Sequence, residues 1–214
     1  LSIAEWRDGG TRYFTGVMRD VTERKRAEEL QRLLVNELNH RVKNTLSVIQ
    51  SIAMLTARSA TSVAAYSRAF SARLMGLART HDLLTERDWD GALITDVVWN
   101  ELKPYDDDQH RVGMQGEAVR LTPKMTMALG MILHELVTNA AKYGSLSDAS
   151  GRVQVTFARV ADGGTPRLRI VWDEHGGPET RRPEREGFGS LLIAQSVKTE
   201  LKGEIRNGLG GMSE

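Results

Sequence analysis

Cysteine is absent from this 214-residue chain, so neither a disulfide nor a metal site built from thiolates is available to it. The five histidines are scattered, without the spacing typical of a zinc site. No apolar run approaches the ~20 residues of a membrane-spanning helix, and no signal peptide is recognisable. We therefore predict a soluble, cytoplasmic protein without a membrane span. Because the chain begins at Leu1 rather than at Met, we expect it to be a fragment.

The chain also lacks an excess of either positive or negative charge. The 29 Lys and Arg residues nearly balance the 28 Asp and Glu residues, and the formal net charge is +1. This balance gives no support for a nucleic-acid-binding surface, so we expect no nucleic-acid partner. The hydrophobic share of 40% is typical of a globular chain, and the length suffices for one or two domains.

Glycine and proline are missing from residues 23–58, where apolar residues recur every three or four positions. This pattern predicts a long helix. A second helical pattern covers 61–85, and the short break between the two predicts an antiparallel hairpin. Two apolar stripes alone make only a thin core, so the hairpin is expected to pair with a second hairpin in a homodimer or to be covered in cis by another domain.

After a hinge at 86–91 the pattern changes to alternating helices and strands. The predicted class is α+β, with a mixed sheet and helices on one of its faces. A further strand is expected beyond the C-terminal Glu214. Before the hairpin, residues 1–20 predict two strands joined by a turn at Asp8–Gly10. The elements expected after the hinge are helices at 93–102, 123–143 and 190–201, strands at 111–119, 153–157, 168–172 and 204–206, and a loop at 174–188.

His40 lies two positions from Leu38 and two from Val42, so on a helix it points away from the apolar stripe and into solvent. Glu37 and Asn44 are one turn away on either side. An exposed imidazole is a competent nucleophile at neutral pH. A lone histidine of this kind is nevertheless more often an ordinary surface residue.

Three polar residues share one narrow face of the helix predicted from Pro123. They are Glu135, Asn139 and Lys142, at positions i, i+4 and i+7. An amide oxygen, and a carboxylate acting through water, suit Mg²⁺, and an ammonium on the next turn can neutralise phosphate oxygens. The alternative is a solvated charged face.

The run Glu37–Leu46, with Ser47–Ala53 after it, resembles the phosphoacceptor segment of HWE-type sensor histidine kinases. The resemblance implies that His40 is the autophosphorylated residue. Many histidine kinases carry an acidic base directly after the histidine, but Arg41 stands here, so Glu37 and Asn44 are the nearby candidates, and Asn44 could only orient the ring.

The run His134–Gly144 resembles the N box of the GHKL ATP-binding fold in its HWE form. This resemblance implies that Asn139 binds Mg²⁺, that Glu135 acts in the water shell of the metal, and that Lys142 binds phosphate. Tyr143 would stack on or border the adenine, although it could equally be a core residue. For His134, a structural role and support of phosphate are both open.

Residues 171–178 resemble the first glycine box, where the HWE pattern is Trp-x-Glu. By this resemblance Glu174 reads the adenine amino group, with Asp173 as the second choice, while Trp172 is expected in the core. The glycines after this pattern permit close backbone approach. A Gly-x-Gly entry into a helix is a phosphate cradle. The remaining predicted ATP-binding residues are Gly176, Gly177, Gly187, Phe188 and Gly189, and a lid at about 178–186 carries Arg181, Arg182 and Arg185, which either screen the triphosphate or solvate the loop.

Together the resemblances imply a sensor histidine kinase of a two-component system that uses ATP and Mg²⁺. Residues 24–86 would be the dimerisation and phosphoacceptor hairpin, and 92–214 the ATP-binding α/β sandwich. Residues 1–23 resemble the end of an upstream PAS sensory domain, although a plain β-hairpin is the alternative. The expected partner is the receiver domain of a response regulator. Two other functions stay open, namely a non-catalytic phosphotransfer scaffold and a GHKL ATPase or serine/threonine kinase that uses no histidine.

Overall fold

The computed structural model of the chain forms two compact units, Leu1–Gln50 and Ser51–Glu214. Among the described residues, no helix is both long enough and apolar enough to cross a membrane. The predicted α+β class is confirmed, because helices and a mixed sheet build the second unit. The structure describes residues 2–17, 19–87, 89–106, 111–163, 165–178 and 188–206.

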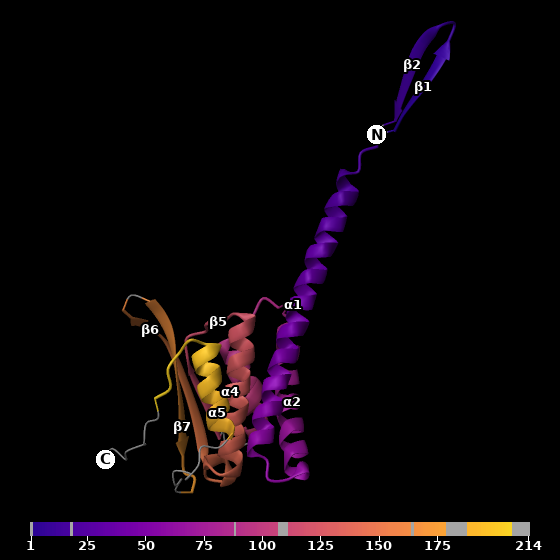
Figure 1. The fold of residues 1–214 in the computed structure, drawn as a ribbon. Helices are drawn as coiled ribbons and strands as arrows, with labels where there is room; N and C mark the ends of the chain where they lie inside the picture. Colours follow the sequence, from indigo (N-terminus) through magenta and orange to yellow (C-terminus); the bar gives the residue numbers. More distant parts are fainter. Residues whose placement is uncertain are drawn as a thin grey trace. The chain divides into compact units, whose positions relative to one another are not determined.

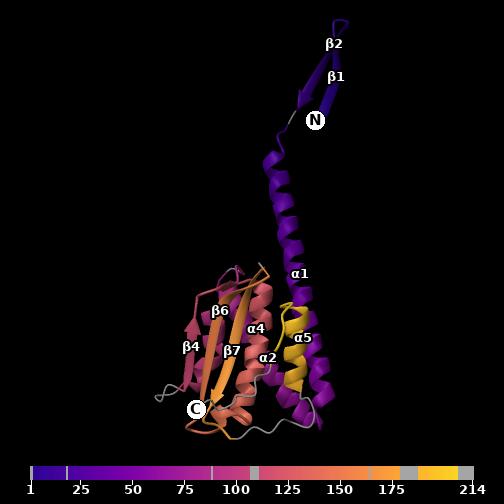
Figure 2. The same cartoon turned by 90° about the vertical axis from the view of Figure 1, so that its left-hand side faces the viewer.

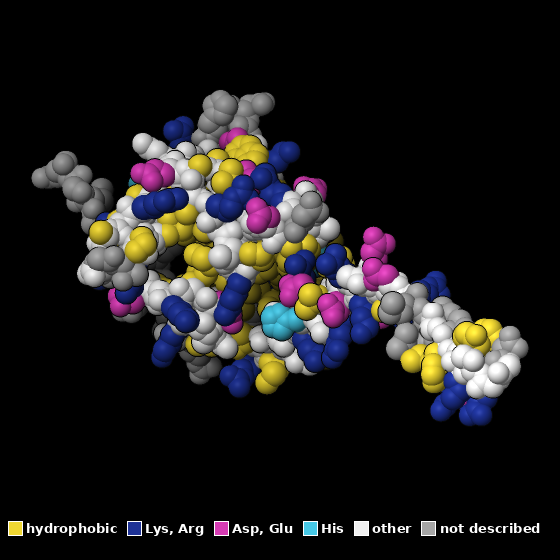
Figure 3. All heavy atoms as spheres, turned by 90° about the horizontal axis from the view of Figure 1, so that it is seen from above, with side chains coloured by type: hydrophobic (Ala, Val, Ile, Leu, Met, Phe, Trp, Pro, Cys, Tyr) yellow, Lys and Arg dark blue, Asp and Glu magenta, His cyan; other side chains and the backbone are white. Residues whose placement is uncertain are grey.

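The first unit begins with the predicted hairpin, formed by strands β1 (Ser2–Asp8) and β2 (Thr11–Val17) (Figure 1). Its turn uses Gly9 and Gly10 with φ of +52° and +87°, a backbone region that favours glycine. Trp6 faces Tyr13 across the strands, and their rings stack with centroids 4.5 Å apart. Hydrophobic and basic side chains lie side by side on the surface of this hairpin (Figure 3).

Helix α1 (Thr22–Ser59) is as long as the missing glycines and prolines predict. Asp20 accepts a hydrogen bond from the Thr22 N–H, and hydrogen bonding from the side chain and then the backbone of Thr22 holds the pKa of Asp20 below its usual value. The stripe of apolar side chains in its first-unit part is largely exposed. Leu30, Leu33, Leu34, Val35, Leu38, Val42 and Leu46 are between 48% and 66% exposed.

The second unit begins within α1, at Ser51, and includes helix α2 (Val63–Thr85), whose first turn is capped by Ser62. Helix α2 packs against helix α4 (Pro123–Lys142) through two glycines. A Cβ at Gly76 would lie 2.7 Å from the Cγ of His134, and a Cβ at Gly130 would overlap Thr80. Because glycine has no side chain, the two helices can approach each other closely at these positions.

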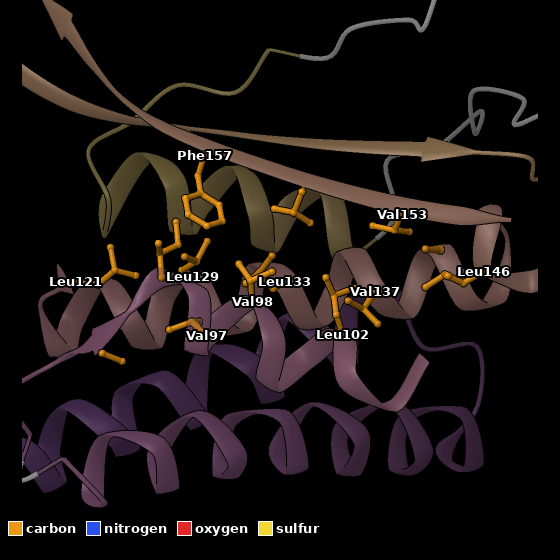
Figure 4. Packing of buried hydrophobic residues seen from close by; sticks show 14 residues of the cluster. Val97, Val98, Leu102, Leu121, Leu129, Leu133, Val137, Leu146, Val153 and Phe157 are labelled. Atoms are coloured by element: carbon orange, nitrogen blue, oxygen red, sulfur yellow. The ribbon is translucent and has the colours of Figure 1, made fainter. Parts of the chain in front are cut away.

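A three-stranded sheet forms the other side of this unit, in the order β4 (Val112–Gly116), β6 (Arg152–Asp162), β7 (Thr165–His175) (Figure 2). The β4–β6 pair is parallel and the β6–β7 pair is antiparallel. Helices α4, α3 (Ile94–Leu102) and α5 (Phe188–Thr199) lie on one face of the sheet. Side chains from β6, α3 and α4 meet in the core, among them Val153, Phe157, Val98, Leu133 and Val137 (Figure 4).

Three details differ from the predicted elements. Residues 203–206 form no strand, although one was predicted at 204–206. Helix α5 begins at Phe188, inside the predicted loop, because the glycine-rich entry already forms its first turn. A two-residue pair, β3 (Ala92–Leu93) with β5 (Arg120–Leu121), and two short 3-10 turns, η1 (Lys103–Tyr105) and η2 (Ser145–Ser147), were not predicted, because so few residues carry no periodicity.

Candidate functional site

His40 is an exposed residue on α1, in the first unit. One turn away, the Asn44 Nδ2 lies 3.5 Å from its Nδ1, at the outer limit of a hydrogen bond. On the other side, Glu37 accepts a hydrogen bond of 2.8 Å from the Arg41 Nε. This bond and the charge of Arg41 hold the pKa of Glu37 below its usual value. The ring can therefore be approached from solvent, with an ionised carboxylate one turn away.

In the second unit, α4 and the start of α5 bring three of the predicted residues together. A Cβ at Gly189 would lie 3.1 Å from the Glu135 Oε2 and 3.2 Å from the Asn139 Nδ2. Any larger residue at Gly189 would therefore crowd these two side chains. A carboxylate, an amide and the N-terminal turn of a helix meet at this point, which is an arrangement suited to a cation and an anion bound together.

An arginine from α2 also reaches this place, and sequence reasoning missed it. The Arg73 Nε and Nη2 donate to the Glu135 Oε1 and Oε2, at 2.6 and 3.2 Å. The arginine side chain is only 16% exposed and the glutamate 5%. The Arg73 Nη1 also lies 3.4 Å from the Thr56 Oγ1 at the end of α1. One signal was available, because Arg73 stands three residues after Phe70 and four before Leu77, within the apolar stripe of α2.

His134 of the N box lies on the α2 side of α4. Its Nδ1 is 3.0 Å from the Oε2 of Glu101 on α3, and the same oxygen accepts a 2.9 Å hydrogen bond from Arg79 on α2. Glu101 is buried, and the guanidinium of Arg79 compensates its charge. The ring also packs against Gly76. The His134 side chain thus connects three helices, which favours the structural role among the two left open.

The end of β7 meets the residues that follow α4. Glu174 on β7 accepts hydrogen bonds from the Ser145 backbone N–H (2.8 Å) and from the Trp172 Nε1 (3.0 Å). Trp172 is also half-buried against the core. Because side chains alternate along a strand, Glu174 and Trp172 share one face of β7. On the same face of the sheet, their partners across the strands are the buried Val153 and Val155 of β6.

Asp173, the second choice for adenine recognition, has the opposite orientation to Glu174, away from α4. A Cβ at Gly177 would lie 2.5 Å from the Ser145 Cα, so the backbone turn after β7 touches the segment after α4. Gly176 has φ of +70°, which glycine adopts without strain. Gly187 and the lid arginines 181, 182 and 185 lie outside the described residues, as does the Phe188 side chain.

The group around Glu135 lies within α4, and the group around Glu174 lies at the residues that follow this helix. From Glu135 to Lys142, the last residue of α4, the helix rises by about 10 Å. Asn139, Lys142 and Tyr143 are exposed between the two groups, Tyr143 by 71%. In the described part of the chain, no cluster of three or more His, Cys, Asp or Glu residues could hold a metal. The oxygen donors Glu135 and Asn139 fit Mg²⁺ that takes its other ligands from phosphate and water.

Comparison with known proteins supplies three findings. Residues 37–118 match the family described as HWE histidine kinase. The blue-light-activated histidine kinases of Brucella ovis and Brucella anthropi are each 38% identical over 188 residues, which are 87% of this chain and 38% of the relative. The solved blue-light activated histidine kinase EL346 of Erythrobacter litoralis has a TM-score of 0.51 at 22% identity, over 87% of this chain and 56% of that chain. The chain therefore spans well under half the length of its curated relatives, and the structural likeness concerns the fold alone.

Proposed function

The chain belongs to the HWE histidine kinase family, as its sequence predicted, and we propose that it uses Mg-ATP to phosphorylate its own His40. The observation that carries this proposal is the meeting of Glu135, Asn139 and Gly189, three residues that the sequence assigned to one nucleotide site. A chance motif match would have no reason to bring the start of α5 against these two side chains.

Each group of residues would hold one part of the substrate. Asn139 would bind Mg²⁺ directly and Glu135 through water, while Lys142 and the glycine-rich start of α5 would bind phosphate. At the other end, Glu174 would accept a hydrogen bond from the adenine amino group, and Gly176 and Gly177 would let the base approach the backbone. Tyr143, which is largely exposed, would border the adenine.

At His40, the reaction forms a bond between a ring nitrogen and the γ-phosphorus and breaks the bond from that phosphorus to the β,γ-bridging oxygen, releasing ADP. The unprotonated ring nitrogen attacks with its lone pair, and the new bond to phosphorus makes the ring cationic, so the proton on the other nitrogen leaves to restore a neutral ring. Glu37 is the candidate acceptor of this proton, since it is ionised and one turn away. Asn44 would only orient the ring.

The partners follow from the same proposal. The phosphoryl group would pass from His40 to an aspartate on the receiver domain of a response regulator. The exposed apolar stripe on the first-unit part of α1 would be covered by a second copy in a homodimer. The β1–β2 hairpin would be the end of an upstream PAS-like sensory domain, and it is too small to enclose a ligand itself.

The direct test is labelling with ATP that carries radioactive γ-phosphate. The parent chain should take up an acid-labile, base-stable label, and His40→Ala should abolish it. The control is His81→Ala, at a half-buried histidine on helix α2, which should keep the label.

Three outcomes would contradict parts of the proposal. A His40→Ala variant that labels as well as the parent would disprove the acceptor. An acid-stable label would indicate a serine/threonine kinase. A parent chain that binds no Mg-ATP in a titration would instead support the non-catalytic scaffold.

A further inference from the structure

The Trp172 side chain has a polar contact that its place in the core does not explain. Trp172 and Glu174 stand two residues apart on β7, and an edge of the half-buried indole meets the exposed carboxylate. The indole Nε1 donates to the Glu174 Oε1 at 3.0 Å. An indole N–H can only donate, and an ionised carboxylate can only accept, so the polarity of this contact is fixed.

The second carboxylate oxygen is held from the other side. The Ser145 backbone N–H donates to the Glu174 Oε2 at 2.8 Å. Gly144 permits this approach, because a Cβ there would overlap the same oxygen. Glu174 is exposed, and a glutamate side chain is ordinarily flexible. Here, however, each carboxylate oxygen accepts a hydrogen bond, one from β7 and one from the segment after α4. Since a carboxylate offers about four lone-pair sites, each oxygen can still accept one further hydrogen bond.

We propose that Trp172 is the positioning residue that makes this site specific for adenine, by holding the Glu174 carboxylate through its indole N–H. This inference rests on the proposed function. A carboxylate held in place accepts a hydrogen bond from the 6-amino group of adenine without first losing rotamer freedom. A base with a carbonyl at the same position would present an acceptor to an acceptor, which leaves both without a partner.

The test compares the affinities for Mg-ATP and Mg-ITP, because ITP carries a carbonyl in place of the 6-amino group. Titration calorimetry on the full chain in a His40→Ala background avoids turnover. The parent background should prefer ATP at least about tenfold. Trp172→Phe keeps most of the packing and removes the donor, so it should lower this preference about three- to tenfold. The loss should come from weaker ATP binding, with ITP affinity nearly unchanged.

Two further variants act on the same carboxylate without touching the indole. Gly144→Ala pushes against the Oε2 and should also lower the preference for ATP. Glu174→Gln supplies an amide N–H that can donate to the ITP carbonyl, so it should relax or reverse the preference. Trp99→Phe is the control, since Trp99 lies on α3 outside the site and is 39% exposed; it should leave the ratio unchanged.

The outcomes separate this inference from the proposed function. If the His40→Ala background binds ATP selectively and Trp172→Phe keeps the full preference while folded, the positioning role is wrong and the kinase proposal stands. An unchanged preference in Glu174→Gln would also overturn it, because the carboxylate would then not read the base. If the background binds neither nucleotide, both the inference and the kinase proposal fail.

Discussion

Helix α1 has exposed apolar side chains in the first unit and buried ones in the second. The contrast separates the contributions of helix length and of tertiary packing to the stability of a helix. In its first-unit part, Leu33, Leu34 and Leu38 are each at least 60% exposed. From Ile52 onward, which is 2% exposed, the same helix contributes to a buried core. Within this chain the first part is supported mainly by helix propensity and length, and the proposed second copy would cover its stripe, whereas the second part is held by tertiary contacts.

Two ion pairs, one from each unit, show a similar contrast in exposure. In the first unit the pair Arg24–Glu28 is exposed by 72% and 63%. In the second unit the pair Arg73–Glu135 is almost entirely buried. Exposed pairs contribute little to stability, while a buried charge that loses its partner is costly. The proposed nucleotide site in the second unit therefore depends on packing, whereas the proposed phosphoacceptor in the first depends on exposure.

The largest effect is expected from the exposed stripe, if it forms the proposed homodimer. Leu34→Glu with Leu38→Glu should convert a dimer into a monomer of 23.8 kDa, measured by light scattering. Each buried leucine contributes about 1.5–3 kcal/mol, and the change removes two from each copy. Met75→Glu, at an exposed methionine of the second unit, is the control and should leave the mass unchanged. A monomeric parent would show that the stripe has no second copy as its partner.

A smaller but still large effect is expected at Arg73. Arg73→Met leaves the Glu135 carboxylate buried without its partner, so the second unit should lose about 3–5 kcal/mol in free energy of unfolding. Arg24→Met breaks an exposed pair of the first unit, and it should change the free energy of unfolding by no more than about 0.5 kcal/mol. Urea denaturation of both variants measures the difference. Equal effects would mean that burial does not distinguish the two pairs.

The fold could be predicted from the sequence where local periodicity carries it. The alternation of Val153, Val155 and Phe157 identified β6, and the step of three and four residues identified α1 and α4. Such periodicity gives the type of element but not its partners. It could not reveal that β4 pairs with β6 in parallel, or that Gly76 and Gly130 bring α2 against α4, because these contacts join distant segments.

In the candidate site, too, local spacing could be predicted from the sequence, whereas contacts between distant segments could not. The helical spacing of Glu135 and Asn139 placed both on one face, and the order of the motifs assigned Gly189 to the same site. The bidentate partner Arg73 comes from 62 residues earlier in the chain, so no local pattern connects it with Glu135. The bond from Trp172 to Glu174 was within reach of strand alternation, but an indole on a strand that faces a core is usually counted as core alone.

A moderate effect is expected from filling the contact between α2 and α4. Gly130→Ala adds a Cβ that overlaps Thr80, so the second unit should lose about 1–3 kcal/mol despite the better helix propensity of alanine. Gly16→Ala in the first unit is the matched control, since a Cβ there meets nothing within 4 Å. Thermal unfolding of both variants measures the contrast. A stabilised Gly130→Ala variant would show that the two helices are not held as close as the structure has them.

The smallest effect concerns the exposed pair beside His40. The hydrogen bond from Arg41 lowers the pKa of Glu37, so the pair stabilises the helix above the ordinary value of 4.5 and loses this contribution as pH falls through the lowered pKa. Arg41→Ala should raise the pKa of Glu37 toward its ordinary value, as measured by NMR titration of the carboxyl carbon. Lys43→Ala removes a nearby charge that makes no such bond and should shift this pKa less. If both variants shifted it equally, the general charge of the helix would set the ionisation of Glu37, and the hydrogen bond would not matter.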